Sequence, residues 1–96
     1  AISIPRQMII IYDIATRCGF KIVQFSDHPD FFSSWSITVN KDERNYLIEH
    51  EGRDGWLIFY RENAPSKFEE LDKKISHAMS DHEKANQCET WLSAVK

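Results

Sequence analysis

The most informative part of the chain lies between residues 35 and 61, where the sequence reads WSITVNKDERNYLIEHEGRDGWLIFYR. Three runs of apolar and aromatic residues occur there, and two polar segments separate them. In the first run Trp35, Ile37 and Val39 alternate with polar residues, which is typical of a strand with one buried face. This region therefore predicts antiparallel strands joined by short hairpins.

The two polar segments carry the turn signals. Residues 41–44 are all charged, and residues 52–55 read Gly-Arg-Asp-Gly, in which Asp-Gly is a strong hairpin signal. The strands that follow them are predicted over residues 46–51 and 56–61. The second of these is apolar on both sides, as is typical of a strand whose two faces are both covered.

The residues before Trp35 predict one more strand and a helix. Phe20 to Phe25 form the strand, which completes a meander of four strands, and residues 26–30 form a loop that leads to the pair Phe31 and Phe32. Apolar residues at helical spacing precede them. We expect Ser3 to cap this helix, Pro5 to lie in its first turn and Gly19 to end it.

The residues after the sheet are predicted to be helical. Ser66 and Glu69 fit one capping box, and Ser80 and Glu83 fit a second. Apolar residues recur at helical spacing after each, first as Phe68, Leu71, Ile75, Ala78 and Met79, and then as Ala85, Cys88, Leu92 and Val95. One long helix agrees with this pattern as well as a helix pair does. We predict a break or bend near Ser80.

Together these elements predict an α+β fold in one domain over residues 1–96, with an N-terminal helix, a four-stranded antiparallel sheet, and a C-terminal helix or helix pair packed on it. Leu57 and Phe59 face one side of the last strand, whereas Trp56, Ile58 and Tyr60 face the other. Helices on one face cannot cover both sets. Either the N-terminal helix crosses the second face, or an apolar patch stays exposed for a partner.

Composition limits the class of partner and the compartment. Twelve basic and fifteen acidic residues give a net charge of −3, which disfavours a nucleic-acid backbone as the main partner. The longest apolar run, Met8 to Tyr12, is too short to cross a bilayer, and no secretory signal precedes it. We expect a cytoplasmic protein whose Cys18 and Cys88 are reduced core thiols; the alternative is one bridge between the terminal helices. Initiator-Met removal or excision from a longer chain would each explain Ala1.

No established catalytic motif is present in the sequence. The best metal-like cluster consists of His77, Asp81 and His82, but His82 does not share a helical face with the other two, so a solvated helix face is the better interpretation. We therefore predict no catalytic residue, no metal site and no cofactor. The alternative is catalysis by His50 or His28 together with a nearby carboxylate.

Acidic and aromatic side chains on the sheet and its loops point to a binding surface. Aromatic anchors with a polar rim are typical of protein interfaces. The expected partner-binding residues are Asp27, Asp30, Phe31, Phe32, Trp35, Tyr46, Glu49, Glu51 and Asp54.

The leading hypothesis is a non-catalytic protein-binding domain that neutralises a basic partner, as an immunity protein or antitoxin neutralises a toxin. The alternative is a homodimeric ligand-binding or small enzymatic domain in which uncovered sheet faces pair. A nucleic-acid-associated protein is the third interpretation and the least favoured, because glutamates beside the aromatic strand would repel phosphate.

Overall fold

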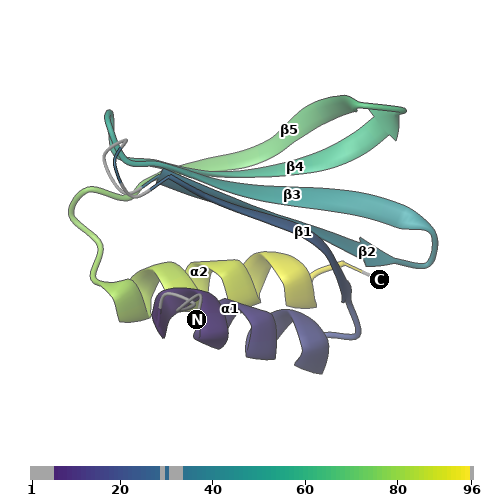
Figure 1. The fold of residues 1–96 in the computed structure, drawn as a ribbon, viewed down its shortest axis with the longest axis horizontal. Helices are drawn as coiled ribbons and strands as arrows, with labels where there is room; N and C mark the ends of the chain where they lie inside the picture. Colours follow the sequence, from purple (N-terminus) through teal and green to yellow (C-terminus); the bar gives the residue numbers. More distant parts are fainter. Residues whose placement is uncertain (1–5, 29, 31–33, 96) are drawn as a thin grey trace.

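The computed structural model describes residues 6–28, 30 and 34–95. Five strands form one antiparallel sheet in chain order, and a helix lies at each end of the chain (Figure 1). The elements are α1 (Arg6–Arg17), β1 (Lys21–His28), β2 (Ser34–Lys41), β3 (Arg44–Glu51), β4 (Trp56–Ala64), β5 (Lys67–Ile75) and α2 (Asp81–Ser93). The predicted α+β class and the antiparallel meander are confirmed, with five strands instead of four.

Both helices lie side by side on one face of the sheet (Figure 1). The N-terminal helix therefore does not cross the second face. We call the side of the sheet away from α1 and α2 the open face. Neither helix of the described chain combines the length and the apolar character needed to cross a membrane.

The end of α1 explains how the chain turns from helix into sheet. Phe20 N–H donates to Ala15 O at 2.9 Å and Gly19 N–H donates to Thr16 O at 3.0 Å, which is the Schellman pattern of a helix C-terminus. Gly19 has a φ of +88°, as this pattern requires. The prediction that Gly19 ends the helix is confirmed, whereas the expected roles of Ser3 and Pro5 fall outside the described residues.

The prediction of a loop over residues 26–30 is wrong for its first part. Strand β1 continues through Ser26 and Asp27 to His28, because each of these residues pairs with β2 across the sheet. Asp30 lies in an exposed turn. Phe31 and Phe32 lie outside the described residues.

The predicted helix after Ser66 is also wrong, because residues 67–75 form strand β5. Ser66 has a φ of +63° and follows Pro65, so the two residues form the tight turn between β4 and β5 in place of a helix cap. Leu71 is the extra residue of a bulge, since Phe59 pairs with Asp72 while Tyr60 pairs with Glu70.

This bulge explains why the sequence resembles a helix there. Phe68 and Ile75 both lie on the open face of β5, and the extra residue Leu71 breaks the strand alternation between them. The three apolar residues are consequently spaced by three and four positions, which is the spacing of a helical stripe.

The second predicted capping box is confirmed at the start of α2. Glu83 N–H donates to Ser80 Oγ at 3.1 Å, and Ser80 N–H donates to Glu83 Oε1 at 3.3 Å. These bonds satisfy backbone donors that a helix N-terminus leaves free. The C-terminal region therefore contains the single helix α2, which begins where we predicted the break.

The two central hairpin turns both contain residues with positive φ. Asp42 and Glu43 join β2 to β3 with φ values of 53° and 67°, as in a two-residue type I′ turn. Gly55 ends the turn between β3 and β4 with a φ of +76°, and its carbonyl accepts a hydrogen bond from Ser76 N–H at 2.6 Å. The end of β5 thus packs directly on this turn.

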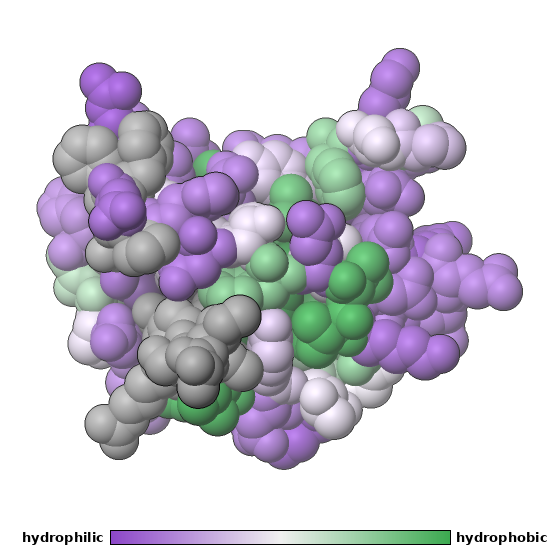
Figure 2. Space-filling model, viewed as in Figure 1, coloured by the Kyte–Doolittle hydropathy of each residue, from purple (hydrophilic) through white to green (hydrophobic). Residues whose placement is uncertain are grey.

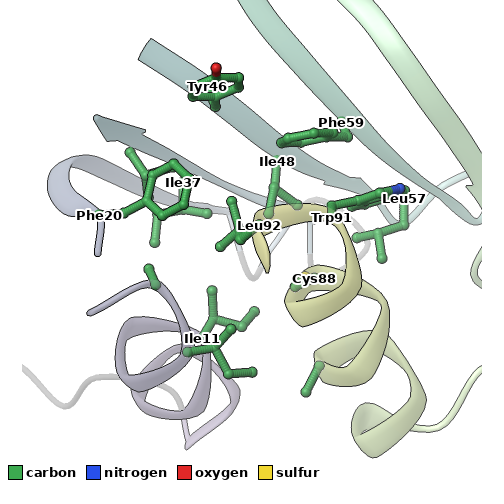
Figure 3. Packing of buried hydrophobic residues seen from close by; sticks show 14 of the residues in the cluster. Ile11, Phe20, Ile37, Tyr46, Ile48, Leu57, Phe59, Cys88, Trp91 and Leu92 are labelled. Atoms are coloured by element: carbon green, nitrogen blue, oxygen red, sulfur yellow. The ribbon is translucent and has the colours of Figure 1, made fainter. Parts of the chain in front are cut away.

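The core lies between the sheet and the two helices (Figure 3). The rings of Tyr46, Phe59 and Trp91 stack in sequence, with centroid distances of 5.8 and 5.4 Å. Cys88 is fully buried beside them, and burial raises the pKa of its thiol to about 12. Cys18 and Cys88 are both free thiols in the structure, with Cys18 half-buried, so the alternative of a disulfide bridge is not supported.

Lys41 connects the C-terminal ends of both helices to the sheet. Its Nζ donates to Cys18 O at 3.1 Å and to Val95 O at 3.3 Å, and it lies 5.2 Å from the centroid of the Phe20 ring. The carbonyls at the C-terminus of a helix carry partial negative charge, so a cation placed there is favourable.

Strand β5 is held to α2 by a polar contact. Trp91 Nε1 donates to Asp72 Oδ2 at 2.9 Å. This bond and the backbone N–H of Lys73 lower the pKa of the Asp72 carboxyl. The ionised form is therefore the form that stabilises the fold.

We expect Asp72→Ala to lower the free energy of unfolding by about 1 kcal/mol at pH 7, because it removes the acceptor of a part-buried hydrogen bond. The stabilisation by Asp72 is complete above the unfolded-state pKa of a carboxyl and is lost as the pH falls through the lower folded-state pKa. Urea unfolding at pH 7 and pH 3 measures both effects. The difference between wild type and Asp72→Ala should shrink at pH 3; an equal difference at both pH values would contradict the role of the charge.

Candidate functional site

The open face is the candidate site because neither helix covers it (Figure 1). Strand alternation and the observed register determine which side chains lie there. The residues of β3, β4 and β5 on this face are Asn45, Leu47, Glu49, Glu51, Trp56, Ile58, Tyr60, Glu62, Phe68, Glu70, Lys73 and Ile75.

Trp56, Ile58 and Tyr60 of β4 form an apolar line along the middle of this face, which we call the aromatic strip. Ile58 is only 7% exposed although no helix covers it. Its cross-strand partners are Glu49 on β3 and Lys73 on β5, so the aliphatic parts of charged side chains flank it. The two rings on either side of it are half-buried. The strip is thus a semi-exposed surface and not a second core.

Further apolar side chains extend the strip toward the β5 edge. Phe68, Leu71 and Ile75 are exposed, with Ile75 reaching 57%. The other exposed large apolar residues are Ile9 and Ile10 on α1 and Val23 on β1. Figure 2 shows hydrophobic side chains gathered near the centre of the visible face, with hydrophilic side chains around them.

Carboxylates surround the aromatic strip. Glu49 and Glu51 lie on β3, Glu62 lies at the end of the strip on β4, and Glu70 lies on β5. The pKa of the Tyr60 hydroxyl is raised, first by burial and then by the negative charges of Glu49 and Glu70. The open face therefore combines an apolar centre with a negative border.

A cation already contacts the strip. Lys73 Nζ lies 4.0 Å from the centroid of the Trp56 ring. A cation over the face of an indole is attracted by the negative charge of the π system. Lys73 is the only basic side chain among the described open-face residues of β3, β4 and β5.

A hollow of about 250 Å³ lies at the end of the sheet nearest the turn between β3 and β4. Its walls are built by His28, Ser34, Trp35, Ser36, Glu49, His50 and Glu51. Both histidines of the enzymatic alternative border this hollow, but strand alternation puts His28 on the open face with Glu49 and Glu51, whereas the His50 ring lies on the helix side of the sheet.

Hydrogen bonds to the turn between β3 and β4 hold two side chains that line this hollow. Ser34 Oγ accepts a hydrogen bond from Gly52 N–H at 3.0 Å, and Glu51 Oε2 accepts one from Asp54 N–H at 2.8 Å. The His50 ring is buried and stacks on Trp35, with a centroid distance of 5.5 Å. The His28 imidazole and the Glu49 and Glu51 carboxylates at the edge of this hollow can hold a cationic or hydrogen-bonding group. Within the described ranges, no group of three His, Cys, Asp or Glu side chains could hold a metal ion.

The expected binding residues do not all lie on one surface. Glu49 and Glu51 lie on the open face, and Asp54 lies nearby in the exposed turn after β3. Asp27 pairs with Trp35, which places it on the helix side of β1, and Asp30 is exposed in the next turn.

The expectation that Trp35 and Tyr46 are exposed anchors is wrong. They are 6% and 5% exposed, and both face the helices as part of the core. Their strands alternate, and the helices cover the side on which the alternation places the larger apolar residues. Phe31 and Phe32, the other two expected anchors, lie outside the described residues.

Trp56 and Tyr60 of the aromatic strip, and the charged residues Glu70 and Lys73 beside it, are absent from the expected binding residues. The apolar residues on both sides of β4 are typical of a strand covered on both faces, and an exposed apolar patch is the alternative that the sequence leaves open. The helical pattern after Ser66 places Glu70 and Lys73 on a helix, whereas the structure has them on β5. The Pro65–Ser66 pair was the signal for a hairpin that would have placed them correctly.

Comparison with protein-family models, with curated proteins and with solved structures found no match.

Proposed function

We propose that this chain is a non-catalytic protein-binding domain that uses its open face to bind and neutralise a basic protein, in the manner of an immunity protein or antitoxin. The observation that carries the proposal is the aromatic strip with its border of carboxylates. Trp56 and Tyr60 supply rigid apolar area, and Glu49 and Glu70 lie on the two strands beside them.

Two properties of this face support a protein as the partner. Aromatic residues are enriched in protein interfaces and supply much of their binding energy. The strip is half-buried in the free chain, so a partner can remove its remaining exposed area from water without a change in the fold.

Charge supports a basic partner. Four glutamates and one lysine occupy the open face of β3, β4 and β5, and the whole chain carries a net charge of −3. Complementary charge increases association rates and suppresses binding of acidic proteins. The same charge opposes the phosphates of a nucleic acid.

The test is capture of partners from the native source by three immobilised proteins. These are the wild type, the double variant Glu49→Gln/Glu70→Gln on the open face, and the double variant Asp13→Asn/Glu89→Gln on the helix side. Both double variants change the net charge by the same amount. We expect the wild type and the helix-side variant to retain the same basic protein, and the open-face variant to bind it roughly tenfold more weakly.

Affinity for the retained protein should also fall as salt is added, since charges at the rim are screened. Neutralisation is tested by adding the wild type or the open-face variant to an assay of the partner's own activity, which only the wild type should suppress at equal concentration. Equal binding by all three proteins, or retention of acidic proteins alone, would rule out the open face as the proposed site.

The hollow supports a second candidate function. His28 borders this space on the open face together with Glu49 and Glu51, and an imidazole beside carboxylates is what a small-ligand-binding or enzymatic domain would require. A screen of small cationic molecules should then find a ligand whose affinity is lowered by His28→Ala. His82→Ala on α2 should leave the affinity for that ligand unchanged. If no ligand responds to His28→Ala, this second candidate is excluded.

A further inference from the structure

The cation that contacts Trp56 belongs to the chain itself. Lys73 Nζ lies over the indole at 4.0 Å, on the face that we propose for a basic partner. Trp56 is half-buried and Lys73 is exposed, so the contact lies at the surface. A partner's cation that approached the same ring would meet Lys73 there.

The ammonium of Lys73 is held weakly. None of the ion pairs between described residues includes it, whereas its neighbour Lys74 pairs with Asp72 at 3.8 Å on the helix side. Its contact with the indole is of the surface kind, which is a weak interaction. The side chain can therefore leave the ring without breaking any other contact that holds its charge.

The surroundings of Trp56 fit a guanidinium better than an ammonium. A guanidinium is planar and stacks on an aromatic face while its edge donates hydrogen bonds to a carboxylate. Glu51 is the direct cross-strand partner of Trp56 on β3, so the two side chains extend from neighbouring positions on the open face. One carboxylate oxygen of Glu51 accepts a hydrogen bond from Asp54 N–H at 2.8 Å, and the other is available for a ligand.

We propose that Trp56 and Glu51 form the seat for an arginine side chain of the basic partner, and that Lys73 occupies this seat in the free protein as an internal competitor. This inference rests on the proposed function and specifies the group that the open face recognises. Binding of the arginine displaces Lys73 from the ring toward solvent, with no change in the backbone of the sheet.

The competition predicts that removal of a lysine increases affinity at this position. Lys73→Gln should bind a hexa-arginine peptide about two- to fivefold more tightly than Lys74→Gln does, because both variants lose one positive charge but only the first frees the ring. Lys73→Met keeps the apolar stem beside Ile58 and should behave as Lys73→Gln does.

The probes are hexa-arginine and hexa-lysine peptides, titrated by calorimetry at low salt into wild type, Lys73→Gln, Lys73→Met and Lys74→Gln. Fluorescence provides a second readout, because Trp35 and Trp91 are buried at 6% exposure each and Trp56 is the accessible tryptophan. We expect hexa-arginine to change the fluorescence more than hexa-lysine does. Trp56→Leu should remove the preference for arginine in calorimetry.

The outcomes separate this inference from the proposed function. If Lys73→Gln and Lys74→Gln strengthen binding of hexa-arginine equally, the change in net charge alone is responsible. That result refutes the arginine seat at Trp56 and Glu51 but does not contradict the proposal that the acidic open face binds a basic protein. Equal affinity of the wild type for both peptides also refutes the seat. If no variant binds either peptide, recognition of basic segments by this face is refuted, and the inference with it.

Discussion

Replacement of Gly55 by alanine should lower the free energy of unfolding by about 3 kcal/mol, the largest effect that we expect from one added methyl group. A Cβ at this position would lie 2.5 Å from His77 Cβ and 3.2 Å from His77 N. The backbone there has a φ of +76°, which alanine adopts only with strain. The hydrogen bond from Ser76 N–H to Gly55 O holds the end of β5 against this turn, so a movement that relieves the clash would strain or break that bond.

Gly19→Ala is the matched control. Gly19 has a φ of +88°, but its added Cβ would approach nothing closer than Lys41 Cε at 3.7 Å, which is an ordinary contact. We expect this variant to lose only about 1 kcal/mol, from backbone strain alone. Urea unfolding of both variants measures the difference. Equal losses of unfolding free energy in the two variants would show that a small movement relieves the clash with His77. A clash predicts in addition that His77→Gly in the Gly55→Ala background recovers part of the lost unfolding free energy.

Lys41→Met should lower the free energy of unfolding by about 2–3 kcal/mol. The variant removes the hydrogen bonds from Nζ to Cys18 O and Val95 O, and the cation beside the Phe20 ring. It leaves part-buried carbonyls at the ends of two helices without this donor. Methionine retains a similar volume, so the loss reports the charge and the donors more than the packing.

Lys21→Met is the control for Lys41→Met, because Lys21 is exposed on β1 and the variant changes the net charge equally. Its free energy of unfolding should stay within about 0.5 kcal/mol of the wild type. Thermal unfolding followed by circular dichroism suffices for the comparison. Similar values for both variants would show that Lys41 contributes no more than a surface lysine does.

The sequence was sufficient for the fold class because its strongest signals are local. The alternation from Trp35 to Val39 and the Asp-Gly turn before Trp56 both depend on near neighbours, and both appear in the structure as predicted. The helix ends at Gly19 and Ser80 were also predictable, since their side chains or backbone requirements act within one turn.

Strand β5 was not predictable from local pattern. Its residues are mostly Lys, Glu and Leu, which favour a helix in isolation. Pairing with β4 and the contact from Trp91 to Asp72 outweigh that preference. The bulge at Leu71 also hides the strand pattern in the sequence. It changes the spacing of the apolar residues from two, which is typical of a strand, to three and four, which is typical of a helix.

The candidate site was predicted only in part for a related reason. Glu49 and Glu51 were placed correctly on the third predicted strand, since their position depends on simple alternation. Whether Trp35 or Trp56 is the exposed tryptophan depends on which face the helices cover, and no local pattern in the sequence contains that information.

The order of the strands has a consequence for how fast the chain folds. Each strand pairs with the next one along the chain, so every hairpin can form from neighbouring residues at a small cost in loop closure. Proteins dominated by such local pairings fold faster than sheets with crossovers. The contact between α1 and α2 joins the two ends of the chain and has the largest sequence separation. We infer that docking of these helices completes the folding reaction, after the hairpins have formed.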